Sequence, residues 1–284
     1  MPVICVANQK GGVGKSTVTI NLAAALALKA SFADPPVDLR ILVIDMDPQT
    51  NSVITFLGGA FGEKRTPPAY QLSDFLLDEV GVPAYEAVFP TDLPRGGQVK
   101  IDCMYAQKQP LKRARTELQA EGIDGYSRLQ AVVEELSRDY DYIFIDTGPA
   151  DDILVENALM ASTHVLIPAE ASPLALVGVE DNLRIIEQIR KWHPDLKVLG
   201  LVPSRVQPNY TTQSMLVEHI QATYGDLALP IIYQRSANYD AISNGLDVFS
   251  YRPARGNSLR SAEPATGEFA DLLDEILRKM ENGT

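Results

Sequence analysis

The sequence is poor in the residues that build disulfide frameworks and metal centres. Only two cysteines, Cys5 and Cys103, and three histidines occur among its 284 residues. There is no C-x-x-C pair and no His/Cys cluster, which disfavours both a structural zinc site and a disulfide-stapled fold. Because each cysteine lies in an apolar, strand-like stretch, we expect both to be small buried hydrophobic residues.

Long apolar runs and an excess of basic charge are also missing. The longest apolar run, residues 22–28, is far too short to cross a bilayer, and no basic leader precedes an apolar segment at the start. Cytoplasmic residence is therefore the expectation. The 25 Lys and Arg stand against 37 Asp and Glu, for a net charge of −12, which argues against a surface covered with phosphate-binding lysines.

The sequence does contain an alternation of short β-branched runs with helical patterns. Strands are predicted at 3–7, 41–45, 142–146, 164–169 and 198–203, more weakly at 99–105 and 230–233, and helices at 15–29, 125–138, 174–192 and 211–224. The alternation predicts a single-domain, doubly wound α/β fold whose mostly parallel sheet is flanked by helices. Residues 31–40 and 58–70 are expected to be surface loops, and residues 264–281 a C-terminal packing helix.

The stretch QKGGVGKST, residues 9–17, predicts the phosphate-binding loop of a P-loop NTPase. It follows an apolar strand and leads into a helix, and three glycines let backbone N–H groups turn onto phosphate oxygens: Gly11, Gly12 and Gly14. In such a loop Lys15 reaches the β- and γ-phosphates, Ser16 ligates Mg²⁺ and Thr17 can bind the α-phosphate. The order of strand, glycines, Lys-Ser and helix disfavours the alternative of a turn that merely opens a helix.

The loop departs from the ordinary pattern at its start. Gln9 occupies the first glycine position, and a second lysine, Lys10, follows it. One lysine is enough to hold a nucleotide phosphate, so Lys10 needs another explanation. On spacing alone, a solvated loop lysine is the alternative.

Strand-end acids supply two further elements. Asp45 and Asp47 close a buried strand at i, i+2 spacing, and Asp146 ends the apolar run YIFID. Ligand sites of doubly wound sheets lie at the carboxyl ends of strands, where a carboxylate can hold the water shell of Mg²⁺. Gly148 and Pro149 form the following turn, where a switch that senses the γ-phosphate could lie. Any one strand-end acid is commonplace, but the three elements together are not.

Together these elements resemble the deviant-Walker-A ATPases of the ParA/MinD superfamily. The loop fits the K-G-G-x-G-K-[ST] form, DMDPQTN (45–51) resembles the second motif, and FIDTGPA (144–150) resembles the third, with Gly148 where the family often has proline. Residues 167–189, 200–209 and 231–254 continue the likeness. It covers nearly the whole chain, 1–284, with residues 31–40 and about 58–115 poorly matched.

The resemblance implies roles for matching residues. Lys10 corresponds to the signature lysine that crosses to the partner's nucleotide in an ATP-bound dimer, and Asp47 to the acid that positions or activates water. The implied catalytic residues are Lys10, Lys15 and Asp47, and the implied Mg²⁺ residues are Ser16, Asp45 and Asp146. The implied nucleotide-binding residues are Lys10, Gly11, Gly12, Val13, Gly14, Lys15, Ser16, Thr17, Pro203 and Ser204.

The charge of the C-terminal segment and the positions of the cysteines distinguish the branches of the superfamily. The C-terminal segment 263–284 has an apolar stripe but six acids against Arg278 and Lys279, which disfavours the membrane-binding helix of MinD-like members. Neither cysteine lies in an exposed glycine loop, which disfavours the iron-protein branch. The ParA/Soj branch, which binds DNA without sequence preference, therefore remains. The candidates for DNA contact are Arg235, Arg252 and Arg255, with a second patch, outside the resemblance, at Lys112, Arg113 and Arg115.

The sequence thus predicts an ATPase that dimerises with Mg-ATP, holds nucleoid DNA as the dimer and releases it on hydrolysis. With a ParB-like or cargo-adaptor partner that stimulates turnover, it would partition or position DNA. No helix-turn-helix segment precedes the loop, so sequence-specific operator binding is not expected. Two alternatives stay open: a relative that positions a protein cargo, and a binding module whose nucleotide is only a dimerisation switch.

Overall fold

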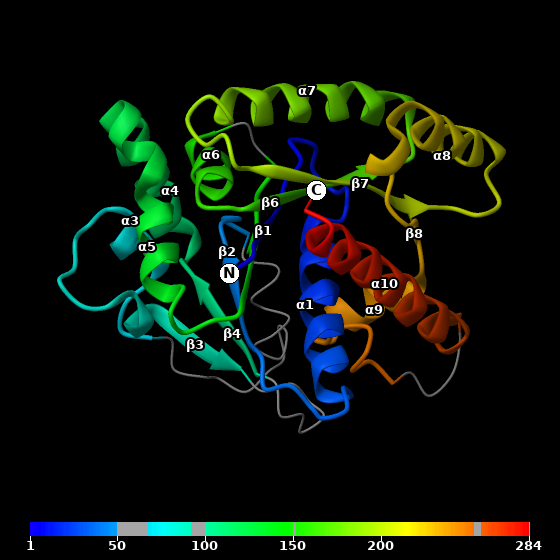
Figure 1. The fold of residues 1–284 in the computed structure, drawn as a ribbon, viewed down its shortest axis with the longest axis horizontal. Helices are drawn as coiled ribbons and strands as arrows, with labels where there is room; N and C mark the ends of the chain where they lie inside the picture. The colour runs from blue at the N-terminus through cyan, green and yellow to red at the C-terminus, as the bar shows by residue number, and fades with distance from the viewer. Residues whose placement is uncertain (50–67, 92–99, 150–151, 253–256, 284) are drawn as a thin grey trace.

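The strands form one twisted sheet at the centre of the molecule (Figure 1). The computed structural model describes residues 1–49, 68–91, 100–149, 152–252 and 257–283. Within them the sheet has eight strands in the order β3-β4-β2-β5-β1-β6-β7-β8, and every pairing is parallel except β3 with β4. The strands are β1 (Val3–Val6), β2 (Arg40–Asp45), β3 (Val88–Thr91), β4 (Lys100–Tyr105), β5 (Tyr142–Asp146), β6 (His164–Glu170), β7 (Lys197–Val206) and β8 (Ile232–Tyr233).

Both faces of the sheet are buried because successive side chains of each strand point to opposite sides. In β1, Val3 and Cys5 belong to one hydrophobic cluster, whereas Ile4 and Val6 belong to the other. Each cluster needs a cover of helices, and this is why the strand sequences are apolar on both faces.

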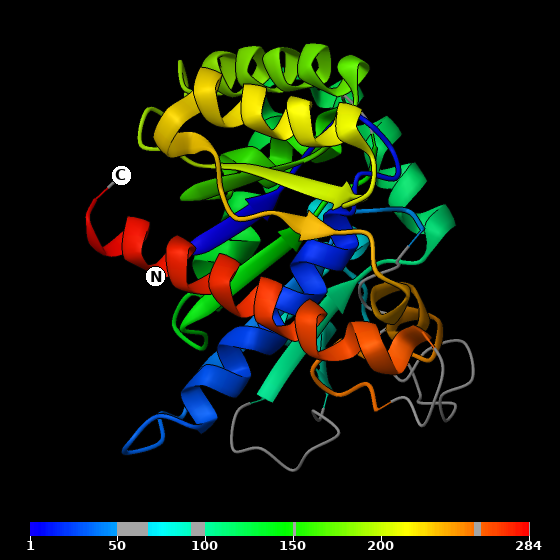
Figure 2. The ribbon, with the colours of Figure 1, turned by 90° about the vertical axis from the view of Figure 1, so that its right-hand side faces the viewer.

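Two sets of helices provide that cover (Figures 1 and 2). One face carries α1 (Lys15–Ser31), α9 (Ser236–Ser243) and α10 (Asn257–Glu281). The other carries α3 (Leu72–Leu76), α4 (Lys108–Glu121), α5 (Arg128–Leu136), α6 (Ile153–Met160), α7 (Pro173–Ile189) and α8 (Thr211–Tyr224). Short 3-10 segments lie at η1 (Ala84–Ala87), η2 (Gly122–Ser127) and η3 (Gly225–Leu227).

The predicted fold class is confirmed, and every predicted strand is present with small shifts in its bounds. The helices α3, α4, α6 and α9 and the edge strand β3 were not predicted. The loop expected at 31–40 is shorter, because α1 continues through Ser31 and β2 begins at Arg40. Most of the loop expected at 58–70 lies outside the described residues.

The C-terminal helix is longer than expected, since α10 begins at Asn257 and contains Pro264 in its interior. Its apolar stripe packs into the core: Phe269, Leu272 and Ile276 are buried in the same cluster as α1. The stripe therefore packs against the protein's own core. Among the described residues, no helix is long and apolar enough to cross a membrane.

The topology fixes where a ligand can bind. β1 lies between β5 and β6, so the chain builds the sheet outward from β1 in both directions. In such open sheets the crevice lies beyond the carboxyl ends of the strands where this reversal occurs. The P-loop, both acidic motifs and the end of β7 all leave the sheet at this edge.

Candidate functional site

The P-loop connects β1 to α1 through backbone conformations that glycine favours. Gly12 and Gly14 have φ values of 75° and 90°, in the left-handed region, and Gly14 is the residue before the first turn of α1. No side chain caps this helix, and the first turn carries no acid. The N–H groups at the start of α1 are therefore available to an anion, in the positive end of the helix dipole.

Lys15 lies inside this loop. Its Nζ donates to the carbonyl oxygens of Asn8 at 2.8 Å and Lys10 at 3.0 Å, and the residue is only 6% exposed. Burial lowers the pKa of Lys15, whereas the carboxylates of Asp146 and Asp47 oppose that shift. The ammonium group is thus a buried cation at the loop's centre, where a phosphate would restore its ordinary pKa.

This pKa shift predicts a pH dependence of nucleotide binding. Binding a phosphate favours protonated Lys15, so affinity should fall with rising pH below the ordinary lysine pKa of 10.5. Calorimetry between pH ~8 and ~10 should show proton uptake on binding, as a dependence of the observed heat on buffer ionisation enthalpy. Apo stability should rise over the same range, because the unfolded chain binds more protons there. Binding without proton uptake would contradict the assignment.

The strand-end acids meet beside the loop. β2 and β5 pair so that Asp45 stands opposite Asp146, and both residues are fully buried. Thr19 of α1 donates its hydroxyl to Asp146 Oδ1 at 3.4 Å. These carboxylates are therefore held beneath the first turns of α1, and the sequence-predicted motifs do come together.

Asp47 lies nearer the surface of the same site. Asp45 Oδ1 accepts from the Asp47 backbone N–H at 2.9 Å, and Asp47 Oδ1 accepts from the Gln49 N–H at 2.8 Å. A Cβ placed on Gly148 would lie 3.5 Å from Asp47 Oδ1, and one on Gly11 would lie 3.4 Å from Pro149 Cβ. The third motif thus lies against both the second motif and the P-loop.

The Lys10 side chain is engaged at the end of β6. Its Nζ donates to Glu170 Oε2, at the end of β6, at 2.8 Å, and lies 3.4 Å from Ser172 Oγ. The Lys10 side chain is 38% exposed. In this single chain the second lysine is therefore an accessible, ion-paired surface group rather than part of the phosphate cradle.

The end of β7 closes the loop from the other side. Ser204 Oγ donates to the Val13 carbonyl at 2.6 Å, and Arg205 Nη1 donates to the Gly12 carbonyl at 2.6 Å. Arg205 has φ 54°, a conformation that is uncommon outside glycine. The sequence predicted Ser204 at the nucleotide but missed Arg205, although it lies in the segment that resembles the family.

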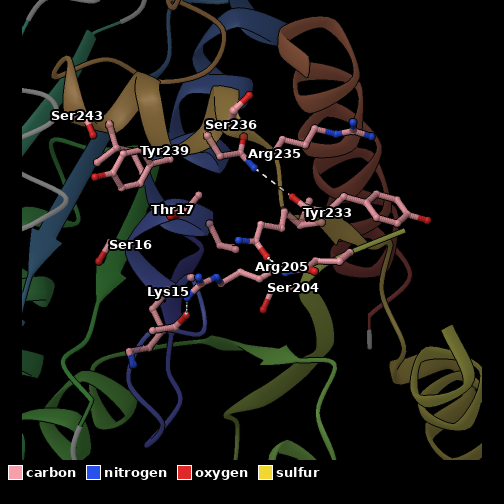
Figure 3. A pocket seen from close by; sticks show the side chains of 18 of the residues that line it. Lys15, Ser16, Thr17, Ser204, Arg205, Tyr233, Arg235, Ser236, Tyr239 and Ser243 are labelled. Carbon is pink, nitrogen blue, oxygen red and sulfur yellow. Dashed lines mark hydrogen bonds between the residues drawn. The ribbon is translucent and has the colours of Figure 1, made fainter. Parts of the chain in front are cut away.

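A cavity of about 1080 Å³ joins these parts (Figure 3). Among the residues predicted for the nucleotide and for magnesium, its wall includes Gly12, Gly14, Lys15, Ser16, Thr17, Asp47 and Ser204; Arg235, predicted for DNA contact, also lines it. It does not include Lys10, Gly11, Val13, Asp45, Asp146 or Pro203. The wall also contains residues that the sequence did not predict for the nucleotide, chiefly Arg205, Gln207, Tyr233, Gln234, Asn238 and Tyr239.

The donor set around the loop is that of a magnesium-nucleotide site. Within the described residues no group of three or more His, Cys, Asp or Glu side chains is arranged to hold a metal by itself. Mg²⁺ usually takes one or two protein oxygens and completes its shell with phosphates and water. Ser16 in the cavity wall, above the buried Asp45 and Asp146, fits that need.

The candidate DNA-binding arginines differ in their surroundings. Arg235 donates to Glu268 Oε1 of α10 through both Nε, at 2.6 Å, and Nη2, at 2.5 Å, and its guanidinium lies over the Tyr233 ring. Arg252 is exposed and donates only to the carbonyl of Tyr251, among the described residues. Arg255 lies outside the described residues.

The second basic patch is largely neutralised by acids of this chain. Arg113 pairs with Glu79 and Glu117, and Arg115 pairs with Asp152. Because these carboxylates offset the arginine charges, the patch offers little net positive charge to DNA.

The Arg235–Glu268 pair predicts a structural role for Arg235. Their side chains are 24% and 11% exposed, and burial raises the pKa of Glu268 although Arg235 favours its charged form. Arg235→Ala should lower the free energy of unfolding by about 1–3 kcal/mol, since it leaves the largely buried Glu268 carboxylate without its cation. Urea denaturation measures this, and adding Glu268→Gln should restore part of the loss. Unchanged stability of Arg235→Ala would instead favour a free, DNA-facing side chain.

Comparisons with known proteins agree with this geometry. A family model described as "AAA domain" matches residues 1–198. The chain is 31% identical over 238 residues to the chromosome partitioning protein ParA of Myxococcus xanthus, covering 82% of this chain and 75% of that protein.

Solved structures extend the likeness to the fold. Apo McdA of Cyanothece superposes with a TM-score of 0.77 at 23% identity, over 98% of this chain and 99% of that one. Cobyrinic acid a,c-diamide synthase of Mycobacterium smegmatis, solved with an ATP analogue and magnesium, gives 0.73 at 24% identity, over 100% and 97%. With its P-loop, its acidic motifs and its ParA relative, the chain belongs to the ParA/MinD superfamily of P-loop ATPases.

Proposed function

We propose that this protein is an ATPase that dimerises with Mg-ATP, binds DNA without sequence preference as the dimer, and partitions or positions DNA with a partner protein. The observation that carries the proposal is the cavity in which an uncapped helix N-terminus, buried Lys15 and Asp47 share one wall. That set provides phosphate binding and a carboxylate for water, which are the two needs of nucleotide hydrolysis.

The proposed roles follow from position. Glycine N–H groups and Lys15 would hold the phosphates, and Asp47 would orient the attacking water. Bound Mg²⁺, held by Ser16 and by water on Asp45 and Asp146, would supply charge neutralisation at the β- and γ-phosphates. Thr147 Oγ1 donates to the Val6 carbonyl at 2.9 Å and so ties the turn after Asp146 to β1.

Lys10 would act across the dimer. Its position on the surface, outside the cavity of its own chain, supports service to a partner's site. A cation delivered in trans to the γ-phosphate acts as an arginine finger does, and ADP offers it no target. Dimerisation would therefore depend on ATP being bound in both subunits.

Of the proposed activities, DNA binding has the least support from the protein's charge, because the chain has a net charge of −12. Exposed Arg252, together with Arg255, is the remaining single-chain candidate, since Arg235 is engaged by Glu268. In a dimer, each exposed arginine would occur twice along one edge. Such charges bind DNA phosphates without sequence preference. Binding of this kind would place the protein on the nucleoid.

The test combines sizing, turnover and DNA retention. With ATP and Mg²⁺ the protein should elute as a dimer, hydrolyse ATP slowly and be retained on nonspecific duplex; with ADP it should be monomeric and unretained. Retention should weaken steeply with salt. Monomers in every condition would contradict the dimer, and retention that ignores ATP would contradict the switch. Absence of turnover with DNA and partner would favour a binding module, and ATP-dependent dimers without DNA retention would favour a protein cargo.

A further inference from the structure

A buried asparagine interrupts the apolar face of α7. Val179, Ile186 and Ile189 of this helix are buried in the core cluster, and Asn182 lies on the same face at helical spacing. Asn182 is only 6% exposed, at a position where the pattern of the helix predicts an apolar side chain. A buried amide is costly unless its donors and its acceptor are hydrogen-bonded. The position therefore requires polar partners beneath α7.

The partners of Asn182 lie at the start of the P-loop. Asn182 Oδ1 accepts from the Gln9 backbone N–H at 3.2 Å, and Asn182 Nδ2 donates to Asn8 Oδ1 at 3.1 Å. Nδ2 also donates to the Gly178 carbonyl of its own helix. The amide is therefore bonded both to α7 and to the segment that enters the P-loop.

Asn8 connects Asn182 to Lys10. Asn8 Oδ1, the atom that Asn182 contacts, also accepts from the Lys10 backbone N–H at 2.8 Å, which closes a turn of the kind that asparagine favours. Asn8 Nδ2 donates to the Pro168 carbonyl of β6 at 2.7 Å. Residues 8–10 are thus held from α7 and from β6, and the backbone of Lys10 is positioned by the side chains of Asn8 and Asn182.

The two lysines of the loop depend on these bonds to different degrees. Lys15 Nζ donates to the carbonyls of Asn8 and Lys10, but the Lys15 backbone belongs to α1 and is held by that helix. The Lys10 backbone instead lies between the bonded turn and the loop glycines, which have the widest conformational freedom. Loss of the Asn182 bonds should therefore change the direction of Lys10 more than the phosphate contact of Lys15.

We propose that Asn182 is a positioning residue for Lys10, which it directs toward the partner's nucleotide in the ATP-bound dimer by holding residues 8–10. The inference rests on the proposed function, because it takes Lys10 to act in trans. A misplacement of about 1 Å can lower the rate of a positioned reaction about 10²-fold. Asn182 is not among the residues that line the cavity, so it acts through the P-loop and not on the nucleotide.

Asn182→Leu tests this role because leucine is similar in size to asparagine and suits the apolar face of α7, but makes neither bond. We expect ATP hydrolysis to be about tenfold slower, with the affinity for ATP changed less than about threefold. Asn182→Ala, which leaves room for water beside Gln9, should show the same result and replaces the first variant if leucine does not pack. Gln188→Ala, at an exposed position of the same helix, is the matched control and should behave as the intact protein.

Mixing with a second variant shows which chain's site depends on Asn182. Chains are mixed one to one as monomers before ATP is added, so that half of the dimers contain one chain of each kind. Asp47→Ala chains keep Asn182 and donate a correctly placed Lys10, so with them the initial rate of hydrolysis should reach about a quarter of that of the intact protein. With Lys10→Ala chains, every lysine comes from an Asn182→Leu chain, and the rate should stay at about a twentieth.

The outcomes separate this inference from the proposed function. Failure of Asp47→Ala chains to restore the rate would overturn the inference, because it would show that Asn182 serves the nucleotide of its own chain. Hydrolysis by Asn182→Leu within about threefold of the intact protein, or a loss of ATP affinity as large as the loss of rate, would overturn it as well. If Asp47→Ala and Lys10→Ala chains do not complement each other, the action of Lys10 in trans is itself wrong.

Discussion

Asp47→Ala is expected to lower the rate of ATP hydrolysis by about 10²–10⁴-fold while ATP still binds. Asp47 is the carboxylate in the cavity wall, and the N–H of Gln49 fixes one of its oxygens at 2.8 Å. A fixed carboxylate can orient a water molecule and take its proton, whereas alanine can do neither. Lys15 and the loop glycines are untouched, so phosphate binding should persist.

The same variant should accumulate as an ATP-bound dimer, because hydrolysis no longer dissociates the dimer. Single-turnover kinetics measures the rate, and light scattering after chromatography with ATP measures the dimer. Asp195→Ala, at an exposed acid before β7, is the control and should match the intact protein in both. A hydrolysis rate for Asp47→Ala within about threefold of the intact protein would indicate that another group activates the attacking water.

The sequence predicted the strands at the sheet's centre because they are buried on both faces and therefore read as unbroken apolar runs. β3 escaped prediction since it is a short edge strand, Val88–Thr91, with a proline in it. Its identity depends on antiparallel pairing with β4, where Phe89 stands opposite Cys103. Edge pairing is a tertiary event that local pattern does not encode.

The helix α4 was also not predicted from the sequence. The segment of α4 was read as a basic patch, yet it buries Leu111, Ala114 and Leu118 on one face. The arginines between them pair with acids of other segments, Arg113 with Glu79 and Arg115 with Asp152. Sequence shows the charges but not the distant partners that neutralise them.

At the site, the local motifs could be predicted from the sequence, whereas the contacts between residues far apart in the chain could not. The P-loop and the two acidic motifs each directly follow a strand of the sheet. Their convergence at one edge is therefore a consequence of parallel topology. The bond from Arg205 to the Gly12 carbonyl spans 193 positions and depends on a left-handed backbone at Arg205. Likewise, Arg235 reads as a surface cation until α10 brings Glu268 to it.

Lys10→Ala is expected to lower ATP hydrolysis by about 10³-fold, as loss of an arginine finger does, with nucleotide affinity changed only a few-fold. The lysine lies outside the cavity of its own chain, so its removal leaves the local phosphate cradle whole. The ion pair with Glu170 that it loses is over a third exposed on both sides, and its loss should cost at most about 1 kcal/mol of stability. Lys29→Ala is the matched control, because Lys29 also forms an exposed pair, with Asp274 at 2.6 Å.

Mixing variants tests whether Lys10 acts on the partner's nucleotide. A Lys10→Ala chain keeps Asp47 but donates no lysine, whereas an Asp47→Ala chain donates Lys10 but does not activate water. If the chains are mixed as monomers before ATP is added, half of the dimers are mixed, and each contains one complete site. The initial rate of hydrolysis should then recover to about a quarter of that of the intact protein, although each variant alone is nearly inactive. Lys10 acting within its own chain would give no complete site in any dimer, and the mixture would stay as inactive as its components.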